Sequence, residues 1–140
     1  TSSGALSRVD WVMQQEPDIV ILAIGGNDGL RGIDPEVTAD NIDLLVQKIQ
    51  TQGAIVVLPG MEMVRNMGQE YTSQFRALYP AVATRRNAIL MPFLLQDVAA
   101  NPKLNQADFI HPTAEGYAVV VANLLPYVEQ AIADVRQHRD

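Results

Sequence analysis

The chain has 140 residues, 48% of them hydrophobic and 19% charged, which suits one folded domain and excludes a disordered chain. Its formal net charge is -6 and its ten Lys and Arg residues are scattered, which argues against nucleic acid as a partner, because phosphate binding requires clustered basic side chains. The absence of cysteine excludes disulfide bonds, thiolate metal sites and cysteine catalysis.

Signals for membrane insertion or secretion are not visible in the sequence. No uncharged apolar run approaches the ~18–20 residues of a membrane-spanning helix, so we expect no stable membrane insertion. The opening residues Thr-Ser-Ser-Gly have neither the basic start nor the apolar stretch of a secretory signal. Because a translation product seldom begins with Thr, we expect the chain to be a processed or truncated piece of a longer protein.

Helices and short apolar runs alternate from the first residues onward. Residues 6–15 have the apolar spacing of a helix, and the following run of residues 18–24 is apolar on both faces. Such a continuous run is typical of a strand covered on both sides, as in a parallel sheet. Asp34 and Pro35 then predict the start of a helix, with Asp as its N-cap, and Gly53 predicts its end.

The alternation continues in the second half of the chain. Residues 54–58 and 88–91 are predicted strands, and between them residues 69–84 form a helix that Pro80 should kink or split. The final helix is predicted over residues 113–137, after one or two helical turns and a polar loop. The side chains predicted to face inward are Phe75, Leu78 and Val82 in the first of these helices, and Tyr117, Val121, Leu124, Val128, Ile132 and Val135 in the second.

This order of elements indicates an α/β fold. Three strands separated by helical crossovers predict a parallel sheet with helices on both faces. No linker or internal repeat is visible, so residues 1–140 are one domain or part of one. Sites in such sheets form at the carboxyl ends of the strands, and three stretches fall there. They are residues 25–28, residues 59–61 and the loop that ends in residues 108–112.

The first stretch, Gly25-Gly26-Asn27-Asp28, follows the first predicted strand. Its two glycines allow a sharp turn and the close approach of another group. The Asn27 amide is a hydrogen-bond donor at the mouth of the sheet, where it could stabilise a developing oxyanion. Gly, Asn and Asp are also ordinary turn residues, so this stretch taken alone favours a plain turn.

The second candidate is a carboxylate three residues before a histidine, Asp108 and His111. The carboxylate can hold the imidazole in one tautomer, and His111 can then act as a general base toward a hydroxyl nucleophile. Loop and capping roles would explain the same residues. The pair could in principle bind a metal, although no third or fourth His or Cys ligand is in sight. His138, in the last turn of the final helix, is interpreted as a solvated surface residue.

Two further features lie beside these stretches. Three methionines in residues 61–67 follow the second predicted strand, and methionine suits either an adaptable substrate wall or an irregular part of the core. Leu30 and Arg31 lie in a loop flanked by glycines, which could move over a bound ligand. Arg31 is equally consistent with a plain surface charge.

Taken together, these stretches resemble a known family. Residues 25–32, GGNDGLRG, resemble the third sequence block of the SGNH, or GDSL-type, serine hydrolases, and residues 108–112, DFIHP, resemble the fifth. The similarity is to the bacterial acyl-CoA thioesterase, lysophospholipase and arylesterase branch, and it extends over essentially all 140 residues. Further positions typical of the branch are Gly60-Met61, residues 66–79, Pro92-Phe93, residues 104–106 and residues 112–116.

The resemblance implies a role for each matching residue. Asn27 would donate to the oxyanion, His111 would be the general base and Asp108 would orient it. The fold would be the three-layer, flavodoxin-like SGNH hydrolase fold. The reaction would be acyl transfer to a serine followed by hydrolysis, with no metal or organic cofactor. The residues that would contact substrate are Gly26, Gly29, Leu30, Arg31, Gly60, Met61 and Ile110, in or beside the loops of residues 29–34 and 60–67.

The sequence departs from the family at its nucleophile. The family's serine lies in a Gly-Asp-Ser motif near the N-terminus, and no such motif is present. Thr1-Ser2-Ser3-Gly4 resembles the stretch just after the second family block, whose glycine N–H completes the oxyanion hole. By this pattern the nucleophile and the first two strands of a five-stranded sheet would lie in an N-terminal segment outside this chain. The strand of residues 19–24 would then be an exposed edge.

None of the four serines present is a good substitute. Ser7 and Ser73 lie in predicted helices, and Ser2 and Ser3 lie at a chain end that we expect to fray. The leading hypothesis is the C-terminal portion of a hydrolase of carboxylic esters or thioesters, among them aryl esters, acyl-CoA and lysophospholipids. The alternative is a non-catalytic α/β binding module or an inactive fragment. The family branch often carries a secretion signal, which implies a periplasmic or secreted location.

Overall fold

The computed structural model describes residues 1–139. The side chains of Arg65, His138 and Arg139 fall outside this description, and so does the interpretation of His138 as a surface residue. The elements in chain order are α1 (Ser2–Leu6), α2 (Val9–Met13), β1 (Ile19–Ile21), α3 (Gly26–Leu30), α4 (Pro35–Thr51), β2 (Ile55–Pro59), the 3-10 helix η1 (Arg65–Met67), α5 (Gln69–Arg86), β3 (Ile89–Met91) and α6 (Ala114–Arg139).

The three strands form one parallel sheet in the order β1-β2-β3, which confirms the prediction from the alternating elements. In the first pair Val20 lies opposite Val56. β1 is shorter than the predicted run of residues 18–24. The ladder continues for one residue beyond it, where Leu22 N–H donates to Val57 O (2.8 Å), and the chain then turns toward α3.

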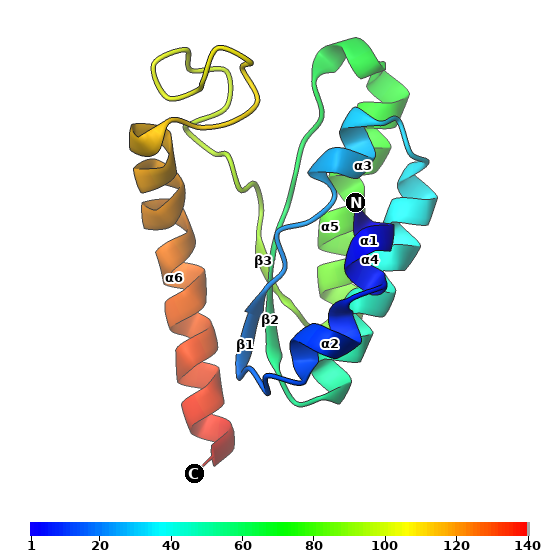
Figure 1. The fold of residues 1–140 in the computed structure, drawn as a ribbon, viewed down its shortest axis with the longest axis vertical. Helices are drawn as coiled ribbons and strands as arrows, with labels where there is room; N and C mark the ends of the chain where they lie inside the picture. The colour runs from blue at the N-terminus through cyan, green and yellow to red at the C-terminus, as the bar shows by residue number, and fades with distance from the viewer. Residues whose placement is uncertain (140) are drawn as a thin grey trace.

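Helices cover both faces of the sheet, as predicted. Figure 1 shows α6 alone on one face and α1, α2, α4 and α5 on the other. The main core lies on the face with four helices, where α4 packs against α5 and both contact β2. Its fully buried side chains include Ile42, Leu45, Ile49, Val56, Leu58, Phe75, Tyr79 and Val82.

The two long helices of this face lie close to their predicted positions. Asp34 caps α4 by accepting the Glu36 N–H (2.9 Å), and Pro35 occupies the first helical position. α5 is one helix, so the split considered at Pro80 does not occur. Pro80 lies on the exposed side of α5, where water can bond the carbonyl that loses its helical partner. The inward residues predicted for α5, Phe75, Leu78 and Val82, are all buried.

The N-terminal region differs from the prediction. Instead of one helix over residues 6–15, the chain forms α1 and α2, and α1 already begins at Ser2. The Ser7 hydroxyl donates to Gly4 O (2.8 Å), which favours a helix end at this point, and Arg8 leaves the helical region with φ -123°. Ser2 is fully buried, so the expected fraying of this end is wrong.

The outward face of α6 also differs from the prediction. Three of the residues expected to face inward, Tyr117, Val121 and Ile132, are exposed, and Val121 is 62% exposed. Val120 and Ala131 are the buried apolar residues of this helix instead. A sheet of three strands is too narrow to cover the whole apolar surface of α6, so part of that surface faces outward.

Within the described chain, α6 is the one helix that is long and apolar enough to cross a membrane, over residues 114–137, by length and composition only. It contains no long uncharged run, because Glu115 and Glu129 interrupt its apolar residues. In the fold this helix packs against all three strands and forms the second covering layer of the sheet.

β1 is an edge strand, as the resemblance implies, and along the described chain no strand pairs with its free side. Ile21 of this strand is 44% exposed. A groove of about 510 Å³ lies between β1 and the helices α1 and α2. Its apolar walls include Val9, Val12, Met13, Val20, Leu22 and Ile24. The sheet therefore presents a free backbone edge beside an apolar groove.

Candidate active site

Three segments gather at the carboxyl end of the sheet, where parallel α/β folds place their sites. Figure 1 shows α3 after β1, the loop of residues 60–68 after β2 and the loop of residues 92–113 after β3 at the same end of the molecule. Each segment carries candidate residues from the sequence: Asn27 in the first, Met61 in the second and His111 in the third.

The structure brings Asp108 and His111 together as a hydrogen-bonded couple. His111 Nδ1 lies 2.7 Å from Asp108 Oδ2. Asp108 Oδ1 accepts the backbone N–H groups of Ile110 (2.9 Å) and His111 (3.0 Å). The carboxylate therefore fixes both the backbone and the ring of the histidine. With Nδ1 engaged, Nε2 is the nitrogen left to exchange a proton with another group.

These hydrogen bonds hold Asp108 in its charged form. They lower the pKa of the Asp108 carboxyl to about 2; the largest effect comes from the backbone N–H of His111, followed by its ring and by the N–H of Ile110. Both side chains are open to water, with exposed fractions of 63% for His111 and 44% for Asp108. The candidate couple therefore combines a charged carboxylate with an imidazole that is open to water.

Local hydrogen bonds fold the loop that presents this couple. Gln106 donates its backbone N–H to His111 O (2.7 Å) and its side-chain amide to Pro112 O (3.1 Å). Asn105 is buried and forms an isolated antiparallel bridge with Pro112. Between these anchors Phe109 adopts φ 57°, in the left-handed region. The loop is thus closed at its base, and the couple lies at its tip.

The first part of the loop of residues 92–113 consists of turns. The predicted helical turns over residues 93–99 form as consecutive hydrogen-bonded turns, with Ala99 N–H donating to Leu95 O (2.8 Å). Asp97 and Ala100 have positive φ angles, which a right-handed helix does not contain, so no regular helix develops.

The stretch expected to form a turn and loop instead begins a short helix, α3. Gly25 precedes it with φ 102°, a conformation that favours glycine. A Cβ on Gly25 would lie 2.2 Å from the Tyr79 hydroxyl, and that hydroxyl donates to Ile24 O (2.9 Å). Gly25 is therefore needed both for the turn and for the approach of Tyr79. Asn27 lies exposed at the start of α3.

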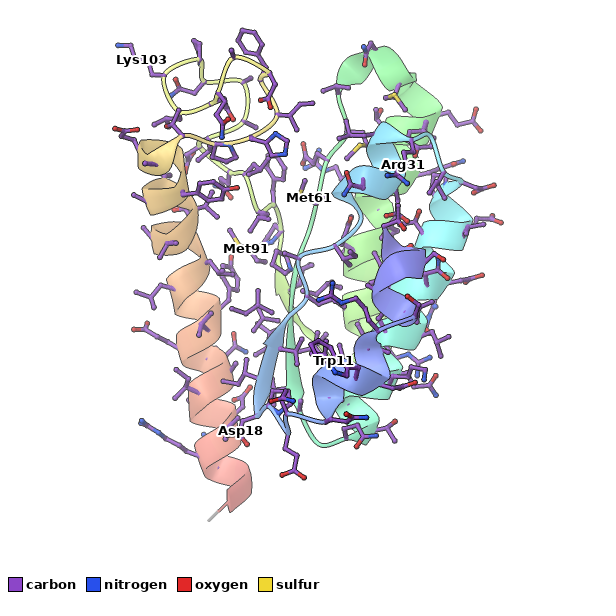
Figure 2. The ribbon with its side chains drawn as sticks, viewed as in Figure 1. Trp11, Asp18, Arg31, Met61, Met91 and Lys103 are labelled. Atoms are coloured by element: carbon purple, nitrogen blue, oxygen red, sulfur yellow. The ribbon has the colours of Figure 1, made fainter. Side chains whose placement is uncertain are left out.

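Methionines from the loop after β2 pack against α3. A Cβ on Gly29 would lie 2.0 Å from Met63 Sδ, and one on Gly26 would lie 3.4 Å from Met61 Cε. Both methionines are partly buried and packed against the main core. They fill the space between this loop and α3, so core filling, one of the two interpretations left open by the sequence, describes their contacts. Figure 2 labels Met61 near the carboxyl end of the sheet.

The remaining residues that the resemblance assigns to substrate lie at the same end. Leu30, Arg31 and Ile110 are exposed, and Figure 2 labels Arg31. Gly60 is buried, and a Cβ there would lie 2.3 Å from Pro92 O. The end of β2 and the segment after β3 approach each other at this glycine, and Gly60 N–H donates to Met91 O (2.8 Å).

Chemically, the described residues offer an imidazole that is hydrogen-bonded to a carboxylate. The Ser2 hydroxyl donates to Asp28 (2.5 Å) and the Ser7 hydroxyl to Gly4 O (2.8 Å), so neither is directed to His111. Across the described side chains, no group of three or more His, Cys, Asp or Glu residues could hold a metal ion. Asn27 and His111 lie on separate segments at one end of the sheet.

A three-layer parallel α/β sheet with these segments at its carboxyl end has the architecture of the SGNH hydrolases. The chain matches the model of the GDSL-like Lipase/Acylhydrolase family over residues 1–119, and it belongs to that family. The crystal structure of TesA is similar, with a TM-score of 0.89 and 35% sequence identity, and the match covers 94% of this chain and 73% of that one. The psychrotrophic esterase EstA from Pseudoalteromonas sp., inhibited by monoethylphosphonate, also has a TM-score of 0.89, with 30% identity over 95% of this chain and 73% of that one.

Curated relatives agree with this assignment and are longer than the chain. Esterase TesA of Pseudomonas aeruginosa is 36% identical over 127 residues, which are 90% of this chain and 63% of the relative. Thioesterase 1/protease 1/lysophospholipase L1 of Escherichia coli K12 is 33% identical over 116 residues, which are 82% of this chain and 56% of the relative. The chain therefore spans less than two thirds of the length of these relatives.

Proposed function

We propose that the whole protein hydrolyses carboxylic esters or thioesters through a serine acyl-enzyme. The observation that carries the proposal is the Asp108–His111 couple, in which the carboxylate engages Nδ1 and leaves Nε2 for proton transfer. The relatives support the reaction class, because they are named an esterase and a thioesterase or lysophospholipase. The combination of an imidazole base with an exposed amide donor at the same end of the sheet suits acyl transfer.

In the proposed mechanism His111 removes the proton of a serine hydroxyl while the serine oxygen bonds to the carbonyl carbon of the ester. The carbonyl oxygen becomes an oxyanion, which the Asn27 amide stabilises. The protonated imidazole then gives its proton to the leaving alcohol or thiol, and the acyl group remains on the serine. In the second half of the reaction His111 removes a proton from a water molecule while the water oxygen bonds to the acyl carbon. The serine oxygen then leaves and takes the proton from the imidazole, and the carboxylic acid is released. Asp108 orients the ring throughout and stabilises its protonated form.

We further propose that the serine lies on a segment that precedes Thr1 and adds a strand beside β1. The free edge of β1 offers a partner for such a strand, and the groove of about 510 Å³ next to it offers apolar cover. The outward apolar side chains of α6 offer further surface on the other face of the sheet. The greater length of the relatives leaves room for a segment of this kind.

The substrate is proposed to be a small acyl ester or thioester bound at the carboxyl end of the sheet. Leu30 and Ile110 expose apolar side chains there, which suit an acyl or aryl group, and Arg31 adds a positive charge near by. The partly buried Met61 can adapt to such a group, because its side chain is unbranched and flexible. A periplasmic or secreted location stays a prediction from the resemblance.

The test is the hydrolysis of p-nitrophenyl acetate by the full-length protein. His111→Ala should lower kcat by at least about 10³-fold, because it removes the base. The chain's other histidine provides the control, and His138→Ala should keep the activity. Full activity of His111→Ala would refute the assignment.

The proposed segment is tested separately by labelling with a fluorophosphonate and mapping the modified peptide. The label should lie on a serine before Thr1, and a label within residues 1–140 would contradict this part of the proposal. A full-length protein that neither hydrolyses the ester nor takes the label would instead support the non-catalytic binding module.

A further inference from the structure

A buried carboxylate lies directly beside the exposed Asn27. The next residue, Asp28, is only 1% exposed, and Ser2 of α1 is fully buried against it. Asp28 Oδ2 accepts the backbone N–H of Ser2 (2.8 Å), and Oδ1 accepts its hydroxyl (2.5 Å). The same hydroxyl accepts a hydrogen bond from the Asn41 amide of α4 (3.0 Å). One carboxylate of α3 is therefore tied to both α1 and α4.

Two tyrosines of α5 form hydrogen bonds to the residues on either side of α3. The Tyr79 hydroxyl donates to Ile24 O (2.9 Å), before α3, and the Tyr71 hydroxyl donates to Ile33 O (2.7 Å), after it. Burial and the nearby charge of Asp28 raise the pKa of both tyrosines, so their hydroxyls stay protonated donors. The segment that carries Asn27 is thus held at three points.

The identity of residue 28 follows from these contacts. An aspartate offers two acceptor oxygens, one for each donor of Ser2, whereas asparagine would turn an NH₂ group toward one of the donors. Successive residues of a helix point about 100° apart, so burying the Asp28 side chain turns the side chain of Asn27 toward the surface. The cost of burying a charged group is offset only because both oxygens are hydrogen-bonded.

We infer that Asp28 is a positioning residue, which locks the start of α3 to α1 so that the Asn27 amide is presented to the developing oxyanion. This inference rests on the proposed function. It adds a role for a residue that touches no substrate and acts through its neighbour. It also explains a buried acid in a stretch that the sequence alone favours as a plain turn.

The experiment is a double-mutant cycle in the full-length protein with p-nitrophenyl acetate. Asn27→Ala should lower kcat by about 10²–10³-fold. Asp28→Asn should lower kcat at least about tenfold while KM stays within about threefold, because positioning of an oxyanion donor acts on the transition state. Adding Asp28→Asn to Asn27→Ala should lower kcat only slightly further, since Asp28 acts through Asn27.

Thr38→Val is the matched control, because it removes a fully buried hydroxyl whose hydrogen bond, to Asp34 O (3.3 Å), lies within the first turn of α4. It should lower the melting temperature and keep kcat. If Asp28→Asn lowered kcat in the Asn27→Ala background as much as it does alone, the inference would be overturned and the proposed function would stand.

Hydrogen exchange gives a readout that does not depend on activity. The N–H groups of Gly29 and Ile33 bond to Gly25 O (2.9 Å) and Asp28 O (3.0 Å), and both should exchange faster in Asp28→Asn than in Thr38→Val. Equal exchange in the two variants would overturn the inference. A wild-type protein that hydrolyses no ester would overturn the proposed function and the catalytic part of the inference, while exchange would still decide whether Asp28 locks α3.

Discussion

Replacing Asp108 with asparagine tests the candidate couple directly. Asp108→Asn can keep an oxygen as acceptor for the N–H groups of Ile110 and His111, but it turns an NH₂ donor toward His111 Nδ1. The ring must then accept at Nδ1 and carry its proton on Nε2, so it can no longer take a proton from serine. For a buried triad aspartate this change lowers kcat by about 10⁴-fold. Because Asp108 and His111 are half open to water, which weakens their electrostatic interaction, we expect about 10²–10³-fold here.

The pH dependence gives a second readout of the same variant. A pKa of about 2, below the ordinary value of 3.8, means that the charged form of Asp108 stabilises the fold above about pH 4, and that this stabilisation is lost as the pH falls toward 2. The Asp108 carboxyl should therefore add no step to the pH dependence of kcat/KM in the wild type above about pH 4. In Asp108→Asn this contribution to the pH dependence of stability should be absent, because the amide does not titrate.

The assay is the initial rate of p-nitrophenyl acetate hydrolysis by the full-length protein across the pH range in which it stays folded. Glu115→Gln is the matched control, because it neutralises another exposed carboxylate in the first turn of α6. An unchanged kcat in Asp108→Asn, or an equal loss in Glu115→Gln, would contradict the role assigned to Asp108.

Three further substitutions test the backbone geometry. Gly25→Ala should lower the free energy of unfolding by about 3 kcal/mol, because a Cβ there meets the Tyr79 hydroxyl at 2.2 Å and the residue must keep φ 102°. Gly53→Ala, with φ 88° and no atom within 4 Å of its Cβ, should lose only about 1 kcal/mol in the same urea titration, and equal losses would show that the contact with Tyr79 is unimportant. Phe109→Gly should raise the stability by up to about 1 kcal/mol, because the left-handed φ of 57° no longer strains an exposed side chain. A lower melting temperature of this variant would count against that account.

Most of the fold follows from the sequence because its strands are apolar on both faces. The apolar runs of residues 18–24 and 54–58 allow no alternation, and α4 is bounded by Asp34 and Gly53, whose roles at helix ends are local. The wrongly predicted inward residues of α6 have a different cause. The outward position of Val121 in α6 depends on the width of the sheet beneath it, which no local pattern encodes.

The candidate site divides in the same way. Asp108 and His111 are three residues apart, so their spacing alone indicated that they could meet, and the structure joins them at 2.7 Å. The hydrogen bonds that hold the segment around Asn27 come from Ser2 and Tyr79, which are distant from it in sequence and were visible only within stretches similar to the family. Gln106, which closes the loop below His111, was visible only as part of a stretch typical of the family.

The Asp108–His111 couple is self-contained. Its carboxylate accepts the N–H groups of two residues that follow it in the chain, so the hydrogen bonds of the couple involve residues 108–111 alone. The donor beside Asp28, by contrast, depends on contacts drawn from three separate helices. The carboxylate–imidazole couple is therefore built from neighbouring residues, whereas the position of Asn27 requires the assembly of three helices around it.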